Sequence, residues 1–254
     1  MIVCDPTSAA WREPLAEAVQ QLTEVDCPAA PSDASAEDTS PALLPQAFAA
    51  LLDAMQRTQV SVEPPDAAAG SGAAGTSRTT ELGEYAVELF DRALTSAHRF
   101  AMADVEQTLQ LYLVSVASWI ARRGGQILSL EPVVDALAQL ANRTREPAEL
   151  VAVYDAMTEI SNAVAPALRQ DLENTSPGRP WRILHLNRAI VATRTHRADI
   201  MEEAFAALVQ NLPDDAPGFF SQGMEQMELL NYPSHVRDVM HRYYRQWSAR
   251  RSLH

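Results

Sequence analysis

The chain has no lysine at all: its 20 basic residues are all arginine, and they stand against 33 acidic residues, for a formal net charge of −13. Binding to nucleic-acid phosphates or to anionic lipid headgroups requires a cationic surface. The charge balance therefore argues against general binding to nucleic acids and to membranes.

Glycine (nine residues) and aromatic side chains (6%) are also scarce, whereas hydrophobic residues make up 47% of the 254 residues. Alanine and leucine supply much of this apolar content. Strands are usually built from β-branched and aromatic residues, so the composition favours helices. The chain is long enough for one or two domains with a substantial core.

Only two cysteines are present, Cys4 and Cys27. A secreted scaffold held by disulfides would need more of them. Residues 1–6 lack the basic start and apolar core of a signal peptide. The most apolar run, residues 109–121, is much shorter than the ~20 residues that cross a membrane as a helix. Together these absences predict a cytoplasmic protein.

Residues 1–80 are expected to form an acidic, partly disordered arm, with 11 acidic residues against three arginines. Two stretches, 28–41 and 61–80, lack the large apolar side chains that offset the entropy of ordering. Elsewhere in the arm, apolar residues at helical spacing predict two amphipathic helices, at about 8–25 and 42–58. Helices this short need a surface to pack on, either the rest of the chain or a partner.

Residues 81–254 are expected to form the main domain. Apolar stripes at helical spacing predict helices over 81–101, 104–123, 129–140, 147–164, 181–193, 199–208, 214–230 and 233–247. Asp104 and Asp199 fit the N-cap position of two of them, and Pro166 should end another. Short connections make successive helices antiparallel neighbours. The predicted fold is all-α: stacked antiparallel helical hairpins, as an irregular α-solenoid or a multi-helix bundle.

No catalytic or nucleotide-binding motif is present. The glycine-rich stretch 70–75 lacks the Lys-Ser/Thr of a phosphate loop. Asp238 and His241, with His235 one turn earlier, could place three metal ligands on one helix edge. A di-metal site in a helical bundle, however, needs a second carboxylate–histidine pair, which the sequence lacks. We therefore expect no cofactor and no metal, and the sequence favours a protein that is not an enzyme.

A row of carboxylates lies on the helix predicted over 81–101, at Glu81, Glu84, Glu88 and Asp91. The row is opposite the apolar stripe of that helix. Such a position is typical of a solvated face, so we predict no metal or acid–base role for these residues.

The last predicted helix is the most basic part of the chain. Residues 235–251 carry five arginines against one aspartate, a local net charge of +4. Arginine and tyrosine are enriched at binding hot spots, and the residues expected to contact a partner are Arg237, Arg242, Tyr244, Arg245 and Arg250. One alternative is that the arginines bind no partner and are only stabilised by the negative C-terminal end of the helix dipole. Another is that arginines and aromatics together grip single-stranded nucleic acid.

A second candidate site lies on the helix predicted over 181–193 and the loop after it. Trp181, His185, Arg188 and His196 could line a pocket between helices, where bundles often bind small ligands. An enzyme or a ligand-binding regulator is therefore the alternative function. The leading hypothesis is a non-catalytic scaffold, adaptor or assembly factor that binds another protein.

Overall fold

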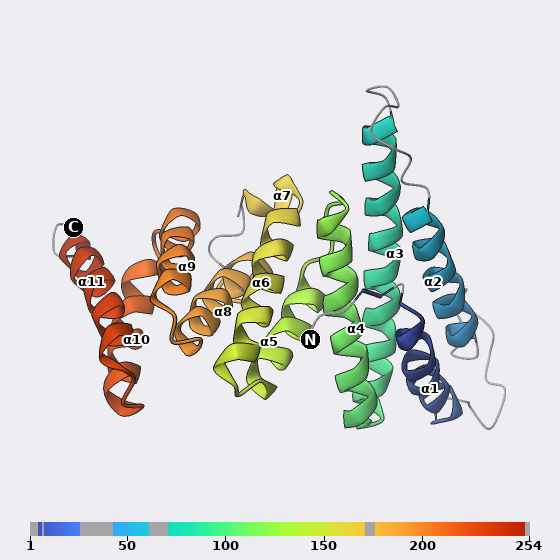
Figure 1. The fold of residues 1–254 in the computed structure, drawn as a ribbon, viewed down its shortest axis with the longest axis horizontal. Coiled ribbons are helices and arrows are strands. Elements are labelled where there is room, and N and C mark those ends of the chain that lie inside the picture. Colours follow the sequence, from blue (N-terminus) through green and yellow to red (C-terminus); the bar gives the residue numbers. More distant parts are fainter. Residues whose placement is uncertain (1–4, 7, 26–42, 61–70, 171–175, 252–254) are drawn as a thin grey trace.

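The computed structural model describes residues 5–6, 8–25, 43–60, 71–170 and 176–251. Within these residues the predicted all-α fold is confirmed, since they form helices and no strand (Figure 1). The helices are α1 (Ala9–Val25), α2 (Leu44–Val60), α3 (Ser71–Arg99), α4 (Ala103–Arg122), α5 (Glu131–Arg143), α6 (Pro147–Ala163), α7 (Pro166–Arg169), α8 (Pro180–Arg194), α9 (Ala198–Asn211), α10 (Ala216–Leu229) and α11 (Ser234–Arg251). No helix in the described part of the chain is both long and apolar enough to span a bilayer.

The helices follow one another along the long axis of an elongated molecule (Figure 1). Helices α3 and α4 pack side by side, as do α8 and α9, and α10 and α11. Helix α6 contacts both α4 and α8 and so joins the two halves of the stack. Helices α1 and α2 lie at one end and α11 at the other.

Proline residues mark several helix starts. Pro132, Pro147 and Pro180 occupy the first turn of α5, α6 and α8, where the missing amide hydrogen has no intrahelical acceptor to lose. Helix α6 ends at Ala163, and Pro166 starts the short helix α7. The predicted break at Pro166 is thus confirmed.

The two predicted N-caps are wrong. The N-cap residues of α4 and α9 are Met102 and Arg197, and neither helix has a side-chain cap. Asp104 and Asp199 instead lie within the first turn. A carboxylate there still interacts favourably with the positive end of the helix, so the same residue type suits both positions.

Helices α1 and α2 pack on the rest of the chain. Their buried apolar residues belong to the same core cluster as those of α3 and α4. The Trp11 ring lies 3.9 Å from that of Tyr112, and the Phe48 ring lies 4.9 Å from that of Phe90, centroid to centroid. The surface that these two short helices require is therefore provided by α3 and α4.

Helix α3 begins at Ser71, so the prediction that residues 61–80 lack structure is wrong for 71–80, and a boundary at residue 80 falls inside α3. Thr79 is buried, and a Cβ at Gly125 would lie 2.8 Å from its methyl carbon. Thr80 Oγ1 accepts a hydrogen bond of 3.0 Å from the Gln126 amide. These contacts anchor the first turns of α3 on the turn after α4. Residues 28–41 and 61–70 lie outside the described residues.

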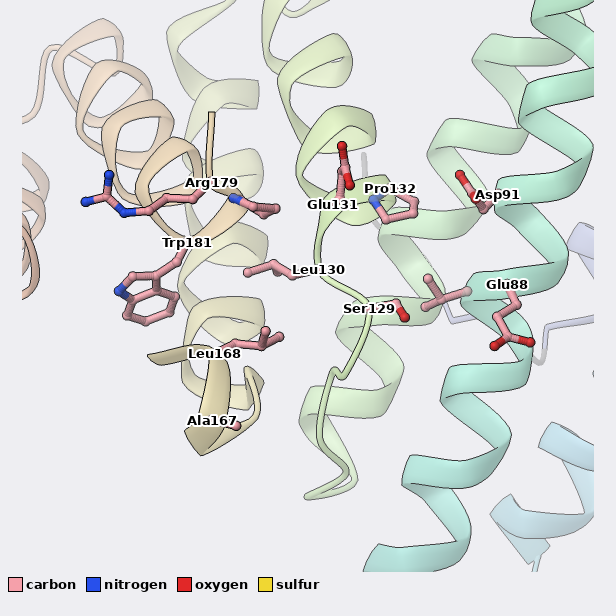
Figure 2. Close-up of a pocket in the computed structure, with 12 residues that line it drawn as sticks. Glu88, Asp91, Ser129, Leu130, Glu131, Pro132, Ala167, Leu168, Arg179 and Trp181 are labelled. Atoms are coloured by element: carbon pink, nitrogen blue, oxygen red, sulfur yellow. The ribbon is translucent and has the colours of Figure 1, made fainter. Parts of the chain in front are cut away.

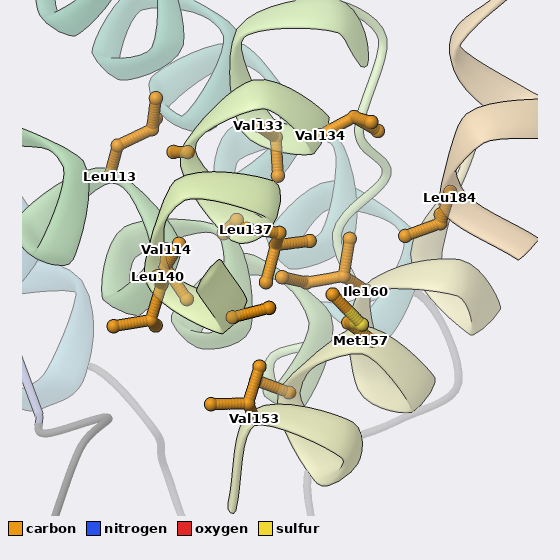
Figure 3. Packing of buried hydrophobic residues seen from close by; sticks show 14 of the residues in the cluster. Leu113, Val114, Val133, Val134, Leu137, Leu140, Val153, Met157, Ile160 and Leu184 are labelled. Carbon is orange, nitrogen blue, oxygen red and sulfur yellow. The ribbon is translucent and has the colours of Figure 1, made fainter. Parts of the chain in front are cut away.

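The centre of the core is formed by α4, α5 and α6 (Figure 3). Leu113, Leu137 and Ile160 are fully buried there, and Leu184 extends the cluster into α8. Such packing fixes the helices that surround the candidate site.

Candidate partner-binding groove

A groove of about 560 Å³ crosses the middle of the stack. It runs between α3 on one side and α7 and the start of α8 on the other, with the start of α5 between them (Figure 2). Segments from α3, α5 with the loop before it, α7 and the start of α8 thus contribute to one concave surface. Such concave surfaces are where stacked helical proteins bind extended partners.

Apolar side chains line the bottom of the groove. They are Val87, Leu130, Pro132, Leu168 and Trp181. Val87, Leu130 and Trp181 are buried, whereas Leu168 on α7 is 37% exposed. A partner that covers Leu168 would remove apolar surface from water, which favours binding.

Carboxylates line the edge of the groove. Glu88, Asp91 and Glu131 are exposed, and no ion pair is described for any of them. Burial raises the pKa of the neighbouring Asp135, and the charges of Glu131 and Asp91 raise it further. Glu131 and Asp91 lie close enough to Asp135 to contribute to this shift, and a cationic group placed near such carboxylates would be favoured.

Arg179, which also lines the groove, does not neutralise the carboxylates on α3 and α5. Arg179 Nη2 lies 3.6 Å from Asp215 Oδ2, and Nη1 donates a 2.9 Å hydrogen bond to the Ser176 carbonyl oxygen. Figure 2 shows its side chain directed away from Glu88 and Asp91. The groove therefore remains acidic on its α3 and α5 side.

The loop before α5 is held in place at two points. The Ile127 amide donates to the Ala163 carbonyl oxygen (2.9 Å), and the Ala165 amide donates to the Ile127 carbonyl oxygen (3.0 Å). Ser129 donates to Glu84 through both its hydroxyl and its amide. These bonds tie α3, the loop and the α6–α7 junction together, so the groove is preformed.

Of the carboxylate row predicted to be a solvated face, Glu88 and Asp91 are exposed but line the groove. Glu84 of the same row is half-buried and bonded to Ser129. Sequence reasoning missed the groove because its other wall comes from α5, α7 and α8. The spacing of the row was visible in the sequence, but what faces it was not.

The four residues of the predicted ligand pocket are only partly brought together. Trp181 and His185 are buried, with ring centroids 4.3 Å apart. Only Trp181 lines the groove. His196 lies at the other end of α8, exposed and with a positive φ of 57°, where its carbonyl oxygen lies 2.9 Å from His235 Nε2.

Arg188, the fourth of these residues, links three helices. Its Nη2 atom donates to Tyr154 Oη (2.8 Å) and to Glu203 Oε1 (2.6 Å), and Nε donates to Thr158 Oγ1 (2.9 Å). Burial raises the pKa of Tyr154 to about 12, against the lowering effect of the Arg188 charge. Arg188 is 5% exposed, and all these contacts join α6, α8 and α9 rather than line a cavity.

The residues predicted to bind a partner on α11 have different environments. Arg237 and Arg245 are exposed, and Arg245 Nε donates to His241 Nε2 (3.2 Å). Arg242 forms an ion pair with Glu202 of α9. Tyr244 is half-buried against the core, and the side chain of Arg250 lies outside the described part. Arg237, Arg242 and Arg245 are thus the exposed members of the predicted set whose side chains are described.

A second cavity, of about 490 Å³, lies between α2 and α3 and is lined by Arg57, Arg78, Glu81 and Tyr85, among others. Among the described residues, no three histidine, cysteine, aspartate or glutamate side chains are grouped so as to hold a metal ion.

No family model, no curated protein and no solved structure matches this chain.

Proposed function

We propose that this chain is a non-catalytic scaffold or adaptor that binds a basic, partly apolar segment of a partner protein in the groove between α3, α5, α7 and α8. The observation that supports the proposal is the pairing of an apolar floor with an acidic edge in one preformed groove. A partner segment with arginine or lysine next to a bulky apolar side chain matches both parts. Charge complementarity of this kind confers specificity on an interface.

The apolar part of the groove provides burial. Leu168 and the surfaces of Leu130 and Trp181 that line the groove can contact an apolar side chain of the partner. The acidic part provides orientation, since Glu88 and Asp91 on α3 and Glu131 at the start of α5 line the same groove (Figure 2). The hydrogen bonds that hold the loop before α5 reduce the ordering of this chain that would oppose binding.

Binding can be tested with a fluorescein-labelled peptide of alternating arginine and leucine, followed by fluorescence anisotropy. The double variant Glu88→Gln/Asp91→Asn should weaken binding about tenfold, since each solvent-exposed charge pair contributes up to about 1 kcal/mol. Leu168→Ala should weaken it about threefold through lost apolar contact.

Matched controls separate the groove from the overall negative charge. Glu225 and Glu228 on α10 are exposed and have the same spacing as Glu88 and Asp91, so Glu225→Gln/Glu228→Gln should bind like the wild type. Leu229→Ala, at a residue that is 75% exposed on α10, is the control for Leu168→Ala. Equal loss in the groove and α10 variants, or equal binding of a glutamate–leucine peptide, would show that the groove is not the site.

A further inference from the structure

We infer that the groove of one molecule receives the arginine face of α11 from a second copy of the chain, so that molecules associate head to tail. This inference rests on the proposed function and names the partner segment for it. The observation behind it is that the chain contains both an acidic groove and a basic helix, and that these lie apart in the structure.

The charge of α11 is opposite to that of the rest of the chain. Residues 234–251 carry five arginines and one aspartate, a net charge of +4. Since the whole chain has a net charge of −13, the other residues together carry −17. Opposite charge on two surfaces of the same protein steers two copies toward each other.

Two exposed arginines of α11, Arg237 and Arg245, lie on one helix face. With His241 they form a stripe of residues spaced by four, with Arg237 and Arg245 about 12 Å apart along the axis. The opposite face carries Val236 and Met240, which are buried against α9 and α10. Arg242 is excluded from the stripe because it is paired with Glu202.

The groove offers matching groups to this stripe. Glu88 and Asp91 project from α3 and Glu131 from α5, with no described ion pair. The aliphatic stems of arginine side chains can lie on apolar surface while their charged ends reach a carboxylate. Leu168, which is 37% exposed, supplies that apolar surface in the groove.

Within one molecule the two surfaces cannot meet. Helices α8, α9 and α10 separate α11 from the groove, and α11 lies at the far end of the elongated stack (Figure 1). An α11 helix that occupies the groove therefore belongs to another copy of the chain. Because the two surfaces differ, the contact is heterologous, and association continues until a ring closes or the chain of molecules ends.

Sedimentation velocity over a series of protein concentrations tests the inference. At about 0.1 M salt the average mass should rise with concentration above the 27.8 kDa of the monomer. At about 1 M salt, where the Debye length falls from about 10 Å to about 3 Å, the mass should return to that of the monomer. A wild-type protein that stays monomeric at about 0.1 M salt overturns the inference, and the arginines of α11 then only form the polar outer face of a terminal helix.

Two variants should each stay monomeric: Arg237→Gln/Arg245→Gln, which keeps the groove, and Glu88→Gln/Asp91→Asn, which keeps α11. An equimolar mixture of the two should form a one-to-one dimer and nothing larger, because only one groove–helix contact is intact in each pair. Arg78→Gln/Arg145→Gln removes two other exposed arginines and should associate like the wild type. A monomeric mixture, or an Arg237→Gln/Arg245→Gln variant that still self-associates, contradicts the inference.

The same variant separates this inference from the proposed function. Arg237→Gln/Arg245→Gln has an intact groove and should bind the arginine–leucine peptide like the wild type. If it binds the peptide while the wild type remains monomeric, the groove has a different partner and only the self-association is wrong. If it does not bind the peptide, the proposed function fails as well.

Discussion

The Tyr112 hydroxyl in α4 donates a hydrogen bond of 2.7 Å to the main-chain carbonyl oxygen of Trp11 in α1. The bond is buried and joins residues 101 positions apart in the sequence. A helix that lay free in solvent would not form a buried hydrogen bond with α4, so α1 is not a solvent-exposed arm. The bond fixes α1 on α4, and through α4 it connects the start of the chain to the centre of the core.

Replacement of Tyr112 by phenylalanine should lower the free energy of unfolding by about 1–2 kcal/mol, because the Trp11 carbonyl oxygen would lose its buried donor. Thermal or urea unfolding followed by circular dichroism measures the effect. Tyr85→Phe is the control, since Tyr85 is 42% exposed and the same change should have little effect there. An equal loss in both variants would mean that the Tyr112 bond contributes nothing specific.

Deletion of residues 1–60 should lower the melting temperature. The sequence predicted that residues 81–254 form the main domain, but Phe90 of that domain is 1% exposed and packs against Phe48 of the deleted segment. The truncated chain would expose an apolar face on α3 and α4, which costs stability in proportion to the area exposed. Calorimetry of the truncated chain measures this. A melting temperature equal to that of the full chain would show that α1 and α2 add nothing to the stability of the core.

Replacement of Arg188 by methionine should destabilise the protein by about 2–4 kcal/mol. The change removes the donor to Tyr154 and Thr158 and leaves polar groups buried without partners. Arg145→Met is the control, because Arg145 is exposed and should tolerate the change. If the two variants unfold at the same denaturant concentration, Arg188 does not hold α6, α8 and α9 together.

Replacement of Asp135 by asparagine should raise the melting temperature at neutral pH. The folded state raises the pKa of Asp135 above its ordinary value of 3.8, so the folded protein binds this proton more tightly than the unfolded chain. The contribution to stability is then fully present below pH 3.8 and is lost as the pH rises through the folded pKa.

The difference in melting temperature between Asp135→Asn and the wild type should therefore be largest at neutral pH and vanish toward pH 3.8. Glu225→Gln, an exposed residue with no described ion pair, gives the effect of removing a negative charge elsewhere. A stabilisation that is independent of pH would contradict the raised pKa of Asp135.

The helices could be predicted because each carries its own periodic apolar stripe. The burial of Val236, Val239 and Trp247 in α11, for example, follows directly from their spacing. The first turns of α3 were missed because glycine, serine and alanine carry little periodic signal, and because Thr79 lies close to Gly125 in the turn after α4. Sequence spacing does not report such distant contacts.

The groove was predictable only in part, for the same reason. The row that contains Glu88 and Asp91 was recognised, but its apolar counterpart comes from Leu168 and Trp181, which are about 80 positions away in the chain. His196 was grouped with Trp181 because the two are near each other in the sequence. The structure instead places them at opposite ends of α8.

The central claim is that the groove binds a basic, partly apolar segment, and photo-crosslinking tests it most directly. An arginine–leucine peptide that carries one benzoylphenylalanine is irradiated with the protein, and mass spectrometry locates the crosslinked residues. We predict crosslinks within 87–91, 129–132 and 167–168, and their loss in Glu88→Gln/Asp91→Asn. Crosslinks confined to other helices, or unchanged in that variant, would contradict the account.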